Sequence, residues 1–225
     1  TLPSRPKFRH EYISQLHFWK GEIGHLRLSE ITKFEIAAGR DQLSKTITRR
    51  HKLMSPATVN RHLAALSSAF RVAIEEWGWL KENPVKHVKK RKEASGRIRF
   101  LSDDERHRLF EACKLSNNPD LYDVVLLGLV TGARRMEIWG LTWDDIDLKN
   151  RIINFRHTKN NKIRGLPMTE ESFQVFKKRS KVIRLDTKLI FPSKKDPQKP
   201  MDFRAPFQKA LEEGQISNFK FHDLR

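Results

Sequence analysis

The sequence predicts a mainly α protein with two parts, an all-helical first domain and a mostly helical, α+β second domain with a small antiparallel sheet. A long helix in the first part is indicated by apolar residues spaced three or four apart, at Val59, Leu63, Leu66, Phe70, Ile74 and Trp77. In the second part, segments 151–155 and 163–167 have the composition of short strands and flank a polar turn. The apolar run 124–130 is too short to span a bilayer and predicts a buried helix.

The first part contains further helices before the long one. Apolar residues within 12–19 indicate one helix, and those within 31–43 indicate others. The long helix begins at Ser55, an N-cap, with Pro56 in its first turn. Gly78 ends the element, because glycine favours helix termination.

The side of the long helix opposite its apolar face carries short and basic residues, at Asn60, Arg61, Ser67, Ser68 and Arg71. Side chains of these kinds can lie close to a phosphate backbone. A helix face that only contacts solvent would have the same composition. For each residue taken singly, this alternative to a DNA contact stays open.

A basic run at 86–92, including Lys89, Lys90 and Arg91, leads into Ser95-Gly96 and is typical of an interdomain linker. A nuclear-localisation signal is the weaker interpretation. We therefore expect a helical domain at 1–90, a basic linker at 91–98 and a second domain at 99–225.

The second domain opens with a capping box, in which Ser102 and Glu105 begin a helix that carries Cys113 on its apolar face. Apolar residues within 173–183 and 203–211 indicate two later helices. A solvated turn, rather than a magnesium cluster, is expected for the acidic group Asp144, Asp145 and Asp147.

The charge of the chain points to a polyanionic partner. Lysine and arginine outnumber aspartate and glutamate 45 to 27, a formal net charge of +18, which exceeds what solubility alone needs. Residues 1–98 hold 20 of the basic and 9 of the acidic side chains, so the first domain has the higher charge density. Nucleic acid is the leading candidate for the partner.

Cysteine usage and hydropathy indicate the compartment. A single cysteine, Cys113, excludes an intramolecular disulfide and a cysteine-based zinc cluster, and we expect it to be an inert core residue. No signal peptide or transmembrane segment is visible, so a cytoplasmic location is expected. The chain starts without methionine and stops directly after a motif residue, which suggests a cut from a longer protein.

The buried run ends in Thr131-Gly132-Ala133-Arg134-Arg135-Met136-Glu137. An arginine at the edge of a core presents five donors in a planar fork, a geometry that suits a phosphate. Ordinary surface arginines at a helix end are an equal alternative from this segment alone.

Two further motifs change that balance. The chain ends in His222-Asp223-Leu224-Arg225, and 158–168 reads Thr-Lys-Asn-Asn-Lys-Ile-Arg-Gly-Leu-Pro-Met. Thr-Gly-x-Arg-x-x-Glu followed by His-x-x-Arg resembles the two boxes of the tyrosine recombinases, the phage-integrase family. The segment between them is similar to that family's lysine-bearing hairpin. The resemblance extends from about Phe8 to the end, more loosely in the first hundred residues.

The resemblance implies a set of roles. The catalytic residues would be Arg134, Lys159, His222 and Arg225, with Lys162 as the competitor for the lysine role. Glu137 lies three residues after Arg134, on the same side of a helix, and would orient its guanidinium. Contacts with DNA are expected from the basic residues Arg61, Arg71, Lys89, Lys90 and Arg91. No cofactor and no metal ion are expected.

The resemblance also implies a tyrosine nucleophile some tens of residues beyond His-x-x-Arg. The two tyrosines of the chain, Tyr12 and Tyr122, precede both boxes, so the catalytic domain is expected to be incomplete at its C-terminal end and inactive in cleavage. The first domain resembles the family's core-binding (SAM-like) domain. Double-stranded DNA is the expected partner, and a tetramer on DNA the expected assembly of the longer protein.

These features predict a site-specific recombinase or integrase that breaks and rejoins DNA through a 3′-phosphotyrosyl bond. A bacterial, prophage or phage-encoded protein associated with the nucleoid is expected. Two alternatives are a sequence-specific DNA-binding protein without catalysis and a topoisomerase-like enzyme that nicks and closes strands. The first explains the charge but leaves Arg134, Lys159 and His222 as coincidence, and only strand exchange between two sites separates the second.

Overall fold

The computed structural model describes residues 9–156, 163–182 and 184–225, and the chain divides into two compact units, Thr1–Gly96 and Arg97–Arg225. The boundary follows the Ser-Gly pair that ends the basic segment. Within the part of the chain that is described, no helix is long and apolar enough to cross a membrane.

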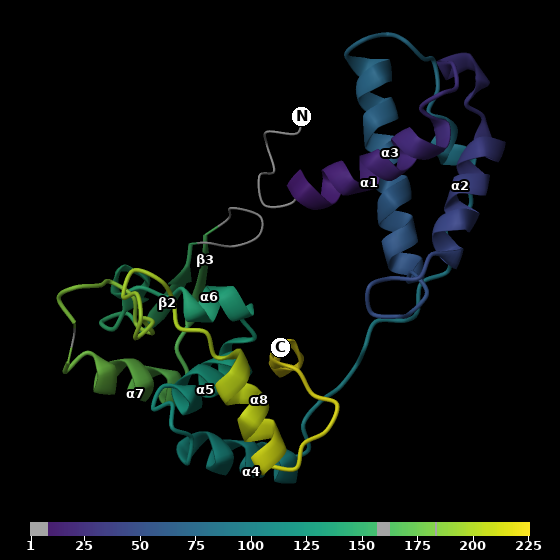
Figure 1. Cartoon of the computed structure of the whole chain (residues 1–225). Coiled ribbons are helices and arrows are strands. Elements are labelled where there is room, and N and C mark those ends of the chain that lie inside the picture. Colours follow the sequence, from purple (N-terminus) through teal and green to yellow (C-terminus); the bar gives the residue numbers. More distant parts are fainter. Residues whose placement is uncertain (1–8, 157–162, 183) are drawn as a thin grey trace. The chain divides into compact units, whose positions relative to one another are not determined.

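Unit 1 is all-helical, as predicted. It contains the helices α1 (Arg9–Ile23), α2 (Lys33–Lys45) and α3 (Pro56–Glu75) and the 3-10 turns η3 (Leu28–Glu30) and η4 (Pro84–His87). The helix α1 crosses α3, and α2 packs against both (Figure 1). The predicted cap of α3 is confirmed, because the Ser55 hydroxyl accepts the N–H of Thr58 at 3.3 Å.

The core of unit 1 is built around Trp19 of α1. Its ring is fully buried among Ile36, Leu43, Val59 and Leu63. The indole Nε1 donates to the backbone oxygen of His62 at 2.8 Å, which satisfies the one polar group of the ring. This ring therefore fixes how the three helices pack.

Gly39 of α2 makes that packing possible, and Gly39→Ala is expected to destabilise unit 1 by about 1–3 kcal/mol. A Cβ there would lie 2.6 Å from Cζ3 of the buried Trp19 ring, so a helix or the ring must move. Gly21, on the exposed side of α1, has no atom within 4 Å of an added Cβ. Gly21→Ala is therefore the control and is expected to stabilise by about 0.5–1 kcal/mol. Urea unfolding measures both, and equal effects would show that the close approach does not matter.

Two residues of the predicted long helix are placed differently from expectation. Trp77 does not extend the apolar face, because α3 ends at Glu75 and the Trp77 side chain is 54% exposed beside Trp79. Asn60, expected on the polar face, is buried. Its side chain accepts the N–H of Arg91 at 2.9 Å and donates to the Arg91 backbone oxygen at 2.8 Å. Asn60 therefore anchors the basic segment to α3.

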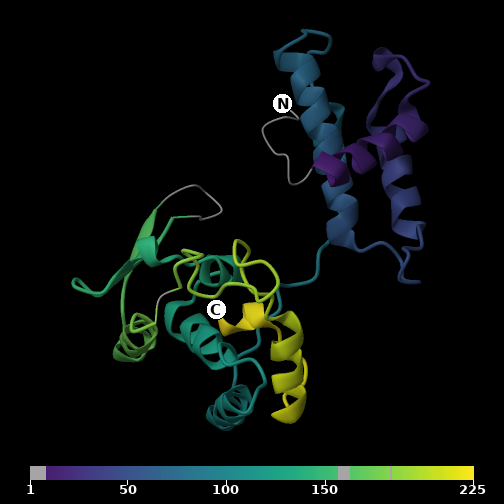
Figure 2. The ribbon, with the colours of Figure 1, turned by 60° about the vertical axis from the view of Figure 1, so that its left-hand side comes forward.

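Unit 2 is mostly helical with one small antiparallel sheet, which confirms the predicted fold class. Its elements are α4 (Asp103–Lys114), α5 (Leu121–Thr131), α6 (Arg135–Trp139), η5 (Trp143–Asp145), β1 (Ile146–Asp147), β2 (Ile152–Phe155), β3 (Arg164–Pro167), α7 (Glu170–Arg179), α8 (Arg204–Glu213) and η6 (Phe221–Leu224). The helix α5 contacts α4, α6, α7 and η6, and α8 packs against α4 (Figures 1 and 2). The most apolar helix is thus central, as its sequence predicted.

The predicted capping box and core cysteine of α4 are confirmed. Ser102 accepts the N–H of Glu105 at 3.1 Å, and the Glu105 carboxylate accepts the N–H of Ser102 at 3.0 Å. Cys113 is buried, and burial raises the pKa of its thiol to about 12. The thiol therefore stays protonated and acts as a small apolar side chain.

The sheet has the order β1-β2-β3, with Ile152 opposite Pro167 and Phe155 opposite Arg164. The two-residue strand β1 was not predicted, because so short a segment shows no alternation. The predicted solvated turn is wrong for Asp145, which is buried. Its carboxylate caps η5 by accepting the N–H of Thr142 at 3.0 Å, and Arg156 pairs with it at 3.1 Å.

Candidate active site

The turn between α5 and α6 places the first candidate arginine. Gly132 adopts a left-handed conformation, φ 55°, and its N–H donates to the Gly128 oxygen at 3.1 Å, which closes α5. The Thr131 hydroxyl accepts the N–H of Ala133 at 3.2 Å. The chain therefore reverses sharply and begins α6 with Arg134 at the N-cap.

Arg134 is held by Glu137 through two hydrogen bonds. Its backbone N–H donates to Glu137 Oε2 at 2.8 Å, and its Nη1 donates to Oε1 at 2.7 Å. The Glu137 side chain is only 3% exposed, whereas the Arg134 side chain is 38% exposed. The buried carboxylate therefore orients a guanidinium that is partly exposed and whose only side-chain partner among the described residues is Glu137.

Glu137 also faces a second arginine, Arg164 at the start of β3, whose Nη2 lies 3.6 Å from Oε2. The Arg164 guanidinium stacks over the Phe155 ring at 5.1 Å. Burial raises the pKa of Glu137, but the hydrogen bonds from Arg134 and the two positive charges outweigh it, so the pKa lies below its usual range. One carboxylate thus serves two guanidinium groups, which leaves the site net positive.

Arg164 is a site residue to which the sequence interpretation gave no role. Its Nε and Nη2 are buried without a hydrogen-bond partner among the described residues. The one available signal was its place in the lysine hairpin, opposite Phe155 at the base of the turn.

The C-terminal motif meets the same turn. Leu224 of η6 is buried against α5, where a Cβ added to Gly128 would lie 3.0 Å from Leu224 Cδ1. A Cβ added to Gly132 would lie 3.8 Å from Arg225 Cγ. The aliphatic part of the Arg225 side chain therefore lies beside Gly132, two residues before Arg134. The structure therefore brings Arg225 to the α5–α6 turn, although the two arginines are far apart in the sequence.

His222 lies on η6, Arg225 directly follows this turn, and both side chains are exposed. Its backbone oxygen accepts the N–H of Arg225 at 3.3 Å. Lys159 and its competitor Lys162 lie outside the described residues. The strands that flank them end at Phe155 and begin again at Arg164, beside Glu137.

Tyr12 belongs to unit 1, and Tyr122 does not lie at this turn. The Tyr12 hydroxyl donates to the backbone oxygen of Ala65 at 3.2 Å, inside unit 1. Tyr122 packs on Phe110, with 5.3 Å between ring centroids, at the opposite end of α5 from Thr131. At 1.5 Å per residue, that helix separates Tyr122 from the turn by about 14 Å.

The expected DNA-contact residues of unit 1 fall into two classes. Arg61, Arg71, Lys89 and Lys90 are exposed, and Arg71 and Lys90 line one groove of about 980 Å³ between α3 and η4. Arg91 differs, because its guanidinium pairs with Asp41 at 2.7 Å.

Known integrases and recombinases resemble this chain in sequence. Residues 99–225 match the model of the phage integrase family. The integrase of Salmonella phage P22 is 28% identical over 249 residues, covering 94% of this chain and 61% of that protein. The shufflon-specific DNA recombinase of Escherichia coli is 38% identical over 146 residues, covering 64% of this chain and 38% of that protein. The chain thus spans less than two thirds of either relative.

Solved integrase structures share the fold. A lambda integrase dimer bound to a COC′ core site aligns with a TM-score of 0.71 at 23% identity, covering 99% of this chain and 82% of that chain. The Tn1549 transposon integrase in complex with transposon right end DNA aligns with a TM-score of 0.72 at 18% identity, covering 96% and 76%. A lambda integrase tetramer bound to a Holliday junction has a TM-score of 0.69 at 22% identity, covering 99% and 67%.

Proposed function

Because the chain belongs to the phage integrase family, we propose that it forms the DNA-clamping and catalytic parts of a site-specific tyrosine recombinase that breaks and rejoins DNA. The observation that supports the proposal is that the stem of Arg225 lies beside Gly132 in the α5–α6 turn, two residues before Arg134, whose guanidinium is held by the buried Glu137. Two guanidinium groups at one turn can bind one phosphate.

The chemistry follows from where charge develops. Transfer of a DNA phosphoryl group passes through a five-coordinate phosphorus whose non-bridging oxygens gain negative charge. Arg134 and Arg225 would stabilise that charge without reorganising during the reaction. In this proposal Lys159 protonates the leaving 5′ oxygen, and His222 assists proton movement. Neighbouring positive charge would favour the lysine as an acid.

The nucleophile is proposed to be a tyrosine other than Tyr12 or Tyr122. Tyr122 lies at the opposite end of α5 from Thr131, and the Tyr12 hydroxyl is hydrogen-bonded within unit 1. In the whole protein it would attack phosphorus and form a 3′-phosphotyrosyl bond, with the 5′ oxygen leaving as a hydroxyl. The bond retains the energy of the phosphodiester, so rejoining needs no further energy source.

Unit 1 is proposed to bind duplex DNA through Arg61, Arg71, Lys89 and Lys90, with Arg91 holding the basic segment in place. The DNA in the related structures supports this partner, and the lambda tetramer supports four copies on DNA during exchange. Action in the cytoplasm at the bacterial nucleoid is proposed together with that substrate.

Cleavage tests the proposal directly. Nicked DNA carrying the recombination site is incubated with the intact protein, and an adduct that survives denaturation is sought. The chain Thr1–Arg225 alone is expected to bind the DNA without forming an adduct. An adduct from this chain would mean that one of its own tyrosines, or a partner's, reaches the site. No adduct from the intact protein would contradict the proposed function.

The salt dependence of DNA binding tests the proposed role of unit 1. The double variant Arg61→Gln/Arg71→Gln is expected to lower the log–log salt slope of DNA affinity by about 2, since each lost phosphate contact removes about 0.9. The control is Lys177→Gln/Lys178→Gln, two exposed lysines of α7 with the same change in net charge. Fluorescence anisotropy at several salt concentrations measures the slope for both double variants. Equal decreases in slope would assign the effect to net charge.

A further inference from the structure

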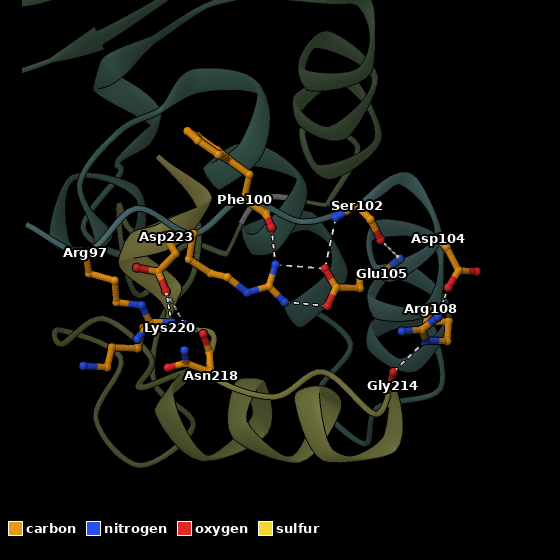
Figure 3. Close-up of polar contacts among 11 residues, drawn as sticks. Arg97, Phe100, Ser102, Asp104, Glu105, Arg108, Gly214, Asn218, Lys220 and Asp223 are labelled. Carbon is orange, nitrogen blue, oxygen red and sulfur yellow. Dashed lines mark hydrogen bonds and ion pairs between the residues drawn. The ribbon is translucent and has the colours of Figure 1, made fainter.

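The segment that opens unit 2 contacts the segment that carries Asn218 and Asp223, near the end of the chain (Figure 3). Arg97, the first residue of the unit, pairs through Nη2 with Asp223 Oδ2 at 2.9 Å and donates to the backbone oxygen of Asn218. The two ends of unit 2 are therefore tied by a charged contact.

Asp223 is the point at which this contact reaches the turn η6. Its Oδ2 also accepts the N–H of Lys220 at 2.8 Å, which caps η6. Burial raises the pKa of Asp223, but hydrogen bonds from Arg97 and from the Lys220 N–H outweigh it, so the pKa lies below its usual range. The carboxylate is therefore ionised at neutral pH and serves the cap and Arg97 together.

The pair is partly shielded from water. The Arg97 side chain is 30% exposed and that of Asp223 is 13% exposed. An ion pair in such a place is screened less than one on the open surface. Arg99 adds a second contact between the same two segments, because its guanidinium lies 5.6 Å from the Phe219 ring centroid. The same guanidinium donates to Glu105 at 2.9 Å.

The turn η6 is short, and contacts between its side chains and the rest of unit 2 set its orientation. It is four residues long, and its backbone bonds include Asp223 N–H to Lys220 oxygen at 2.8 Å and Arg225 N–H to His222 oxygen at 3.3 Å. On one side Leu224 packs against Gly128 of α5. Phe221 packs against Trp139 and Phe207, with 5.8 and 5.2 Å between ring centroids. Apolar contacts thus hold the turn at Phe221 and Leu224, and the Arg97–Asp223 pair adds a charged contact at the residue between His222 and Leu224.

We propose that Arg97 is a positioning residue for strand cleavage, which holds η6 through Asp223 so that His222 and Arg225 face the scissile phosphate. The inference rests on the recombinase function proposed above. It assigns to the first residue of unit 2 an effect on the last residues of the chain. Displacement of a reacting group by about 1 Å can cost a hundredfold in rate.

The test is Arg97→Ala in the intact protein. Single-turnover adduct formation at saturating DNA is expected to fall by about 10- to 100-fold, with the dissociation constant for site DNA unchanged within about threefold. Arg97→Lys keeps the charge and is expected to restore most of the rate. Asp223→Asn is expected to have a similar effect, and the double variant should be no slower than the slower single variant, because both remove one contact.

Arg108→Ala is the matched control. Arg108 also lies in the cluster of Figure 3, where its Nε donates to the backbone oxygen of Gly214 at 2.9 Å, but it does not contact η6. The rate for this variant is expected to match the wild type. A wild-type rate for Arg97→Ala, or an equal loss for Arg108→Ala, would overturn the positioning role.

Hydrogen exchange on the chain Thr1–Arg225 separates this inference from the proposed function. Arg97→Ala is expected to speed exchange at the amides of Asp223 and Arg225, with α4 and α5 unchanged. Unchanged exchange at both amides would overturn the inference even where the recombinase assignment holds. If the wild-type protein forms no adduct, the recombinase assignment fails, and the exchange result still decides whether Arg97 orders η6.

Discussion

Arg134→Ala is expected to lower the rate of strand cleavage by the intact recombinase about a thousandfold, with affinity for site DNA largely retained. Removing one preorganised donor to a developing negative charge costs about 3–4 kcal/mol of transition-state stabilisation. Arg134 fits that description, because Glu137 fixes one side of its guanidinium at 2.7 Å while the rest reaches the surface. The measurement is single-turnover adduct formation on nicked site DNA, with affinity measured separately by anisotropy.

Arg135→Ala is the neighbouring control. The Arg135 guanidinium stacks over the Trp139 ring at 5.0 Å, and among the described residues no hydrogen bond or ion pair joins it to Glu137. Its loss is expected to change the rate by less than about tenfold, since no charge-stabilising donor is removed. Arg134→Ala that folds, binds DNA and cleaves at the wild-type rate would remove Arg134 from the catalytic set.

Local signals explain most of what the sequence predicted correctly. The Ser55 cap, the Ser102–Glu105 capping box and the Arg134–Glu137 spacing each involve residues at most three apart. Such contacts are fixed by the helix itself and are therefore readable from a short window. The fold class followed from these elements and from the apolar run that became α5.

The contacts that were not predicted join segments distant in the sequence. The approach of Arg164 to Glu137 requires the sheet to pack beside α6, and the Arg97–Asp223 pair requires both ends of unit 2 to meet. The periodicity of apolar residues within one helix or strand does not predict either long-range contact. The burial of Asp145 was also missed, and its ion pair with Arg156 joins residues eleven apart in the sequence.

Replacing Glu137 is expected to have the largest effect on stability. Glu137→Ala should lower the free energy of unfolding of unit 2 by about 2–4 kcal/mol. Removing one partner of a buried ion pair leaves the other charge uncompensated. Here Arg134 can still reach water, which places the cost below the highest typical values, whereas Arg164 keeps buried Nε and Nη2 atoms that then face no carboxylate.

Calorimetry of the chain Thr1–Arg225 measures this effect, as a shift of the transition assigned to unit 2. Asp186→Ala is the control, because Asp186 pairs with Arg184 on the open surface, and a change of less than about 1 kcal/mol is expected. Equal shifts for the two variants would show that the buried carboxylate of Glu137 contributes no more to stability than an exposed one.

Lowering the pH should reduce the difference in the free energy of unfolding between the wild type and Glu137→Gln. The pKa of Glu137 is lower in the folded state than its ordinary value of 4.5, so its ionised form stabilises the fold above that value. This contribution is lost as the pH falls through the folded-state pKa, where the carboxyl becomes protonated in both states. Glutamine cannot ionise, so the stability gap to the wild type should be full at pH 7 and should narrow below about pH 4.5. A gap that is independent of pH would mean that the shape of the side chain, and not its charge, supports Arg134 and Arg164.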